Sequence, residues 1–206
     1  MSRFVIPALV GAAIAVPVST IAPPTAQAQY SNTYNFFQGI RDRDFAAVEA
    51  AVDAPGSTVI NVREGESGDA AIHIVTRRRD TSYLLYLLRA RANPNLANRD
   101  GNTAMHIAAQ IGYEDGIHWL NVVEANVDIR NNRGETPLIL AVQQRNEAVI
   151  RRLIEAGADP DVPDNVVGMS ARDYAERDSR GARLLALLDQ AQPQDRSAEQ
   201  VGPSPN

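Results

Sequence analysis

Two histidines hold corresponding places in the sequence and are the first candidates for chemistry. His73 and His106 each end a similar tetrapeptide, one that begins at Ala70 and one that begins at Thr103. Two imidazoles on neighbouring elements suggest zinc or iron, but such sites need three or four nitrogen, sulfur or carboxylate ligands. No carboxylate recurs beside them, the chain has no Cys, and Ile139 occupies the third corresponding place. We therefore predict structural roles for both histidines, and we expect neither a metal site nor a cofactor.

The chain shows no recognisable catalytic arrangement. It contains neither the Gly-x-Ser-x-Gly elbow of serine hydrolases nor a glycine-rich phosphate loop. All 20 basic residues are Arg, and the 25 acidic residues give a formal net charge of -5. A negative chain does not neutralise phosphates, which argues against general affinity for nucleic acid. We predict a protein that is not an enzyme and has no catalytic residues, with catalysis by an unrecognised set of residues as the alternative.

The segments that carry these histidines repeat along the chain. Copies that begin at Gly68, Gly101 and Gly134 align without gaps at a constant interval, and a fourth copy begins at Gly168, one position later than that interval requires. Self-similarity at a period of about 33 residues indicates an array of supersecondary units that stack on one another. The glycines and the Asn and Asp residues near them are expected to form turns, because they tolerate positive φ. These polar turn residues are Asn98, Asp100, Asn131, Asn132, Asp164 and Asn165.

Each unit is predicted to contain two short helices. Thr103 and Thr136 are suited to cap the first helix, and Pro137 takes the first helical position, where a missing N–H costs nothing. Breaks after the first helix are expected at Arg79, Gly112 and Arg145. On the second helix, apolar residues at helical spacing predict one buried stripe. The stripe consists of Leu84, Leu87, Leu88, Ile117, Leu120, Ile150, Leu153, Ile154, Leu184, Leu187 and Leu188.

This pattern resembles the ankyrin-repeat family. The family's TPLH-type start appears as Thr136-Pro137-Leu138-Ile139, and its glycine-rich end appears as Gly157-Ala158-Asp159-Pro160. The resemblance implies an all-α solenoid of helix-turn-helix units with turn or β-hairpin-like connections. About five repeats are implied within residues 29–190, starting near 34, 68, 101, 134 and 168, with an enlarged loop at 53–66. In this family the histidine of the starting tetrapeptide holds the turn through hydrogen bonds.

The two ends of the chain carry other signals. Arg3, an apolar stretch from Phe4 to Ala22 and the small residues Ala26 and Ala28 predict a secretory signal peptide at 1–28, cleaved after Ala28. An uncleaved signal that anchors the chain in the membrane is the alternative. The polar residues 191–206 predict a disordered tail. We therefore expect an exported monomer, periplasmic or secreted, with no permanent membrane span after cleavage.

The resemblance also implies where a partner binds. In ankyrin proteins, partners dock on the turn tips and on the ends of the first helices, which form the concave face. The repeat pattern does not require the residues at those places here, so we expect their side chains to be free for a partner. The candidates are Arg77, Arg78, Arg99, Gln110, Ile111, Arg133, Gln143 and Gln144, in a row that also holds Glu66, Ser67, Asp69, Asp100, Asn102, Asn132 and Glu135. Ile111 is expected to be the one exposed apolar candidate.

The predicted function is a protein–protein interaction module of the bacterial cell envelope, which binds an unidentified partner protein through the concave face. A secreted effector or toxin-neutralising protein is the alternative, and an enzyme is a third possibility. An aromatic patch at Tyr113 and Trp119 is the alternative place for the partner to bind.

Overall fold

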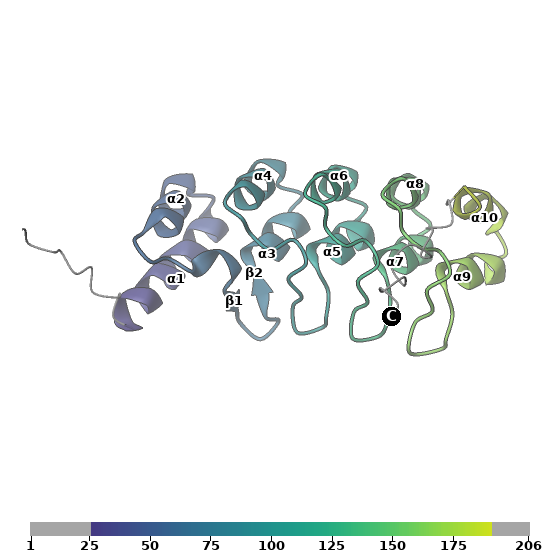
Figure 1. Ribbon diagram of the computed structural model, residues 1–206, viewed down its shortest axis with the longest axis horizontal. Helices are drawn as coiled ribbons and strands as arrows, with labels where there is room; N and C mark the ends of the chain where they lie inside the picture. The colour runs from purple at the N-terminus through teal and green to yellow at the C-terminus, as the bar shows by residue number, and fades with distance from the viewer. Residues whose placement is uncertain (1–25, 191–206) are drawn as a thin grey trace, which may run out of the picture.

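The computed structural model describes residues 26–190, and the side chains of residues 31–190. This part of the chain forms helix pairs that stack side by side along one axis (Figure 1). The first helices of the pairs lie in one layer and the second helices in another, and the long loops project beyond the first-helix layer. The first helices are α1 (Ala26–Asp42), α3 (Ala71–Arg77), α5 (Ala104–Ile111), α7 (Pro137–Gln143) and α9 (Ala171–Arg177). The second helices are α2 (Phe45–Asp53), α4 (Thr81–Arg89), α6 (Glu114–Val122), α8 (Glu147–Glu155) and α10 (Ala182–Leu188). The predicted all-α solenoid is confirmed.

Two predictions from the sequence concern segments at the ends of the chain. Residues 1–25 of the predicted signal peptide and the whole predicted tail, 191–206, lie outside the described residues. Helix α1 begins at Ala26 and contains the predicted cleavage position after Ala28. Between residues 26 and 190, no helix combines the length and the hydropathy that crossing a membrane requires.

The helices begin and end where the sequence predicted. Thr136 precedes α7, and its hydroxyl accepts a hydrogen bond from the N–H of Ile139 at 3.3 Å. The three predicted breaks all have left-handed backbone, with φ of 55° at Arg79, 72° at Gly112 and 54° at Arg145. This conformation strains a non-glycine residue. At Arg145 the same residue also links neighbouring repeats, because its guanidinium pairs with Asp178.

One apolar core runs through the stack. The predicted stripe on the second helices is buried at every helix, although Leu88 and Ile154 are only half-buried. Alanines of the first helices fill the places where neighbouring first helices pack together, and Ala108, Ala109 and Ala141 are completely buried. A single helix pair cannot bury such a face alone, so each repeat depends on its neighbours.

The segment predicted as an enlarged loop has local structure. A short 3-10 helix (Val59–Asn61) leads into the strands β1 (Arg63–Glu64) and β2 (Asp69–Ala70). The strands pair antiparallel, with Glu64 opposite Asp69, and they are the only strands within residues 26–190. The hairpin holds the first of the projecting tips.

A chain of side-chain-to-backbone hydrogen bonds connects the long turns that follow the second helices. Each side-chain oxygen accepts from the backbone N–H of the next member at 2.8 to 3.0 Å. Every second hydrogen bond in this series joins one repeat to the next, so the series fixes how neighbouring turns stack. Its members are Asn61, Asn93, Asn95, Asn126, Asp128, Asp159 and Asp161.

Candidate protein-binding face

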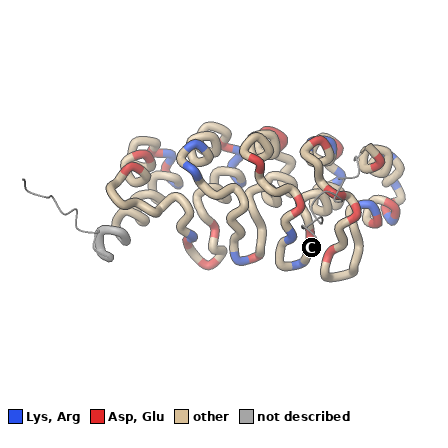
Figure 2. Tube along the Cα trace, viewed as in Figure 1, with Lys and Arg blue, Asp and Glu red and all other residues tan. Residues whose placement is uncertain are grey.

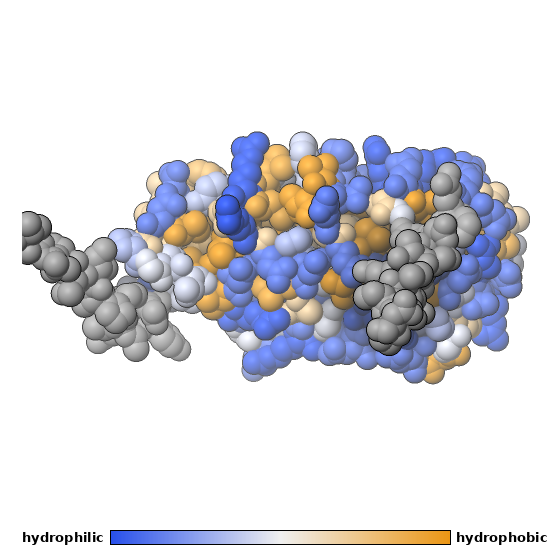
Figure 3. Space-filling model, in the orientation of Figure 1, coloured by the Kyte–Doolittle hydropathy of each residue, from blue (hydrophilic) through white to orange (hydrophobic). Residues whose placement is uncertain are grey.

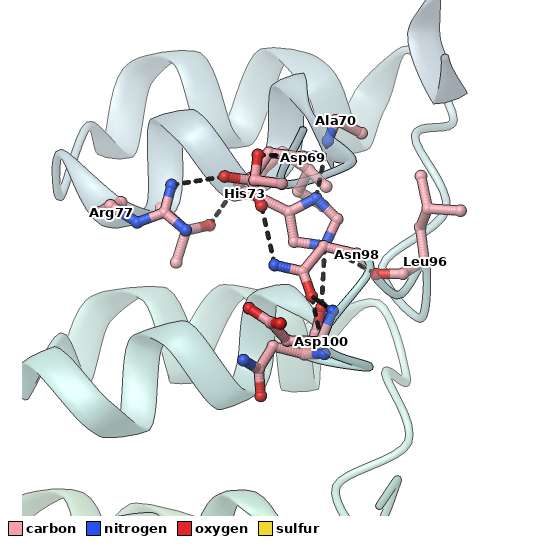
Figure 4. Close-up of polar contacts among 11 residues, drawn as sticks. Asp69, Ala70, His73, Arg77, Leu96, Asn98 and Asp100 are labelled. Carbon is pink, nitrogen blue, oxygen red and sulfur yellow. Dashed lines mark hydrogen bonds and ion pairs between the residues drawn. The ribbon is translucent and has the colours of Figure 1, made fainter. Parts of the chain in front are cut away.

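The two histidines close the base of the projecting hairpins. The Nδ1 of His73 accepts from the N–H of Ala70 at 3.0 Å (Figure 4). Its Nε2 therefore carries the proton and donates to the carbonyls of Leu96 at 2.9 Å and Asn102 at 3.1 Å. The ring is completely buried and joins the start of α3 to the next repeat. This is the structural role that the sequence predicted.

His106 repeats this arrangement one unit later. Its Nδ1 accepts from the N–H of Thr103 at 3.2 Å, and its Nε2 donates to the carbonyl of Glu135 at 3.0 Å. Burial lowers the pKa of His106 to about 4, and burial also lowers the pKa of His73. Both rings are therefore neutral near pH 7. No group of three or more His, Cys, Asp or Glu that could hold a metal ion occurs in the part of the chain that the structure describes.

The three projecting hairpins that follow the β1–β2 hairpin are each closed by an Asn or Asp side chain. The Oδ1 of Asn98 accepts from the N–H groups of Asp100 and Asn102, both at 3.0 Å. Asn131 and Asp164 hold the corresponding places in the next two hairpins and close them in the same way. These three residues lie in turns, as the sequence predicted, but the positive φ is found at the glycines and not at them. They are hydrogen-bond acceptors instead.

The closed tips are joined to one another. The N–H of Arg99 donates to the carbonyl of Ser67 at 3.0 Å, and the N–H of Asn132 donates to that of Asp100 at 3.0 Å. The N–H of Asn165 continues the series by donating to the carbonyl of Arg133 at 2.8 Å. Neighbouring tips therefore hold one another in register, which makes them a rigid platform.

The predicted partner-binding residues lie on these tips and at the ends of the first helices. We call this surface the tip face and define it by the tips Glu66–Ser67, Arg99–Asp100 and Asn132–Arg133 and by the C-terminal ends of α3, α5 and α7. Gln110, Gln143 and Gln144 are exposed on it. Basic and acidic residues both occur at the tips (Figure 2).

Several candidates are not free, which corrects the expectation from the sequence. Arg77 pairs at 2.8 Å with Asp69, which is buried, and Arg133 pairs at 2.8 Å with buried Glu135. Arg78 donates to the carbonyl of Ile40 at 2.5 Å.

Two more candidates have structural contacts. Arg99 donates to the carbonyl of Glu66 at 2.7 Å. Ile111 is half-buried against the core, so it is not the exposed apolar residue that was expected.

A cleft opens between two neighbouring tips. Its volume is about 330 Å³, and polar side chains form most of its lining. The lining residues are Asp100, Asn102, Gln110, Asn131, Asn132, Arg133 and Leu140. Five residues of the predicted row thus meet in one place, although they come from different repeats: Asp100, Asn102, Gln110, Asn132 and Arg133.

The alternative aromatic patch does not form as predicted. Tyr113 is buried, and its hydroxyl forms a 2.7 Å hydrogen bond with that of Thr81. Trp119 is half-buried and contacts His118 edge to face, with a centroid separation of 4.9 Å. Only the Trp119 side of that patch is near the surface.

One tip is apolar, which was not predicted from the sequence. Val166 and Val167 are 67% and 59% exposed on the hairpin before α9, while the other tips are polar. Figure 3 shows the tips as a mainly hydrophilic surface with an apolar patch at this last one. The longer spacing from Gly134 to Gly168 was the available signal, because the extra residue lies in this tip.

Comparison with known protein families agrees with this architecture. Residues 72–164 match the family described as ankyrin repeats, in three copies. The match covers α3 to α8 and the tips with the cleft between them. Ankyrin repeats are generally protein–protein interaction modules. Residues 72–164 of this chain therefore carry three ankyrin repeats, and the described part of the chain is an all-α repeat solenoid.

Proposed function

We propose that this chain is an exported binding protein of the bacterial cell envelope that holds a partner protein on its tip face. This face corresponds to the concave face of ankyrin stacks. The observation that carries the proposal is the cleft at Asp100 and Arg133, set in a row of tips that hydrogen-bond to one another. Rigid, preorganised surfaces lose little entropy on binding, which favours specific recognition.

Exposed side chains that do not hold the repeats together also favour binding of a partner on the tip face. Gln110 and Gln144 are exposed at the ends of α5 and α7, and neither forms a hydrogen bond with another described residue through its side chain. Amides and balanced charges suit a specific, partly polar protein interface rather than a lipid surface.

Export rests on the sequence at the N-terminus. Arg3, the following apolar stretch and the small residues Ala26 and Ala28 have the form of a cleaved signal. Mass measurement of the protein from its own host is expected to give a chain that begins at Gln29. A full-length chain in the membrane fraction would contradict export by cleavage.

The binding face is tested with a partner captured from the envelope extract of the host. Replacing Gln110, Gln143 and Gln144 with Ala together is expected to weaken the affinity for that partner at least tenfold, since hot-spot residues each contribute about 1 kcal/mol or more. Thermal unfolding checks that the variant is folded. A matched triple variant on the second-helix layer is expected to bind normally; it replaces Arg89, Asn121 and Arg151, all exposed, with Ala. Unchanged affinity in the first variant would place the partner on another face.

A further inference from the structure

Asp100 has a carboxylate that no cation within residues 26–190 compensates. The residue is exposed at the tip before α5, and it takes part in none of the ion pairs of the described chain. Its backbone is fixed on both sides. The N–H donates to Asn98 Oδ1 at 3.0 Å, and the carbonyl accepts from the N–H of Asn132 at 3.0 Å. The carboxylate is thus attached to a fixed point and is left without a partner of opposite charge.

The other charged residue of the cleft is already paired. Both Nε and a terminal nitrogen of Arg133 contact the same carboxylate oxygen of Glu135, at 2.9 and 2.8 Å. Glu135 is 5% exposed whereas the Arg133 side chain is 65% exposed, so the carboxylate end of this pair is shielded from water. Because Glu135 neutralises Arg133, the charge of Asp100 dominates the cleft.

The rest of the lining complements a long cationic side chain. Gln110 is exposed and contributes an amide oxygen, whereas the amide oxygen of Asn102 already accepts from Asn131 Nδ2 at 3.0 Å. Leu140, which is 4% exposed, adds an apolar wall. Lys and Arg combine an aliphatic stem with a charged head, and they commonly lay the stem on apolar surface while the head meets polar groups.

We propose that this cleft receives one cationic side chain, Arg or Lys, from an extended segment of the partner protein. This inference rests on the proposed function and names the chemistry that the tip face recognises. The stem lies against Leu140, and the head donates to the carboxylate of Asp100 and the amide oxygen of Gln110. Repulsion from Asp100 disfavours an anionic side chain, and Arg133 already pairs with Glu135.

The test uses the protein as its host produces it, labelled with ¹⁵N, and three peptides of the form acetyl-Ser-Gly-Xaa-Gly-Ser-amide, in which Xaa is Arg, Gln or Glu. The Arg peptide is expected to shift the backbone amides of Asn102 and Asn132 saturably. The Gln and Glu peptides are expected to bind about tenfold more weakly or worse, because a hydrogen bond to a charged group is stronger than a neutral one. Added salt is expected to weaken the binding of the Arg peptide only.

Two variants make the test specific. Asp100→Asn keeps the shape of the side chain and is expected to reduce the affinity for the Arg peptide about tenfold. Glu66→Gln is the matched control, because Glu66 is also exposed and unpaired but lies on the tip before α3, outside the cleft. It is expected to leave the affinity unchanged.

Three results would overturn the cationic site: equal binding of the Arg and Gln peptides, preference for the Glu peptide, or no loss of affinity in Asp100→Asn. Absence of binding by all three peptides would overturn it as well. None of these results decides whether a partner protein binds the tip face, because the glutamine variants and the captured partner test that separately.

Discussion

Because His73 and His106 are buried and neutral, we expect the fold to lose stability as the pH falls below about 6.5. His106 accepts a hydrogen bond from the N–H of Thr103 through Nδ1. A second proton on the ring would place two donors face to face and would charge a group that is completely buried. For these reasons the pKa falls from its ordinary value of 6.5 to about 4, with burial as the largest cause.

The sign and size of the effect follow from this shift. The unfolded chain takes up the proton near pH 6.5, whereas the folded chain resists until about pH 4, so falling pH favours the unfolded state. The contribution of His106 to stability is present above about pH 6.5 and is lost as the pH falls toward 4. The loss amounts to about 2 kcal/mol at about pH 5, and to about 3 kcal/mol once the pH reaches the folded pKa. His73 adds to it in the same direction.

Urea unfolding at about pH 7.5 and about pH 5 measures this loss. His106→Ile copies the residue that Ile139 supplies in the next repeat. The variant is expected to be less stable near pH 7.5, because the bond to Glu135 is gone. Between the two pH values, the free energy of unfolding of the variant is also expected to fall by about 2 kcal/mol less than that of the original protein.

The exposed His118 provides the control for this assay. His118→Gln is expected to leave the acid-induced loss unchanged. Carboxylates whose pKa is lowered, such as Asp69 and Asp164, take up protons below about pH 5. They therefore do not contribute to the loss of stability measured between the two pH values. Equal losses in the original protein and in His106→Ile would refute the reasoning.

Two further predictions concern the stack. Leu153→Ala removes a completely buried side chain and is expected to lower the free energy of unfolding by about 2–5 kcal/mol. Arg151 is exposed on the same helix, so Arg151→Ala is expected to change the free energy of unfolding little. Similar urea midpoints for the two variants would contradict the stacked core. Gly101→Ala is expected to be clearly more destabilising than Gly65→Ala in thermal unfolding, although both residues have positive φ. A Cβ at Gly101 would lie 2.5 Å from the backbone nitrogen of Asn132, but one at Gly65 would meet nothing within 4 Å, so equal losses would show that the tips are not in contact.

The sequence by itself determined the repeat and the elements within it. Helix starts such as Thr136-Pro137 and breaks such as Gly112 depend on the residues immediately around them, so they can be identified locally. The apolar spacing on the second helices, for example Ile150 and Leu153, likewise specified which side is buried. The structural role of His73 followed from the repeat and the family resemblance.

Only the tertiary structure decided which side chains of the tip face are free. Arg77 and Arg133 are exposed and charged, yet each is paired with a buried carboxylate, at Asp69 and Glu135. The cleft beside Asp100 forms between residues that belong to different repeats and are far apart in the chain. A repeat pattern gives the type of residue at each place, but the distance between side chains of neighbouring repeats depends on how the repeats pack. That packing determines which charges neutralise each other and which one is left for a partner.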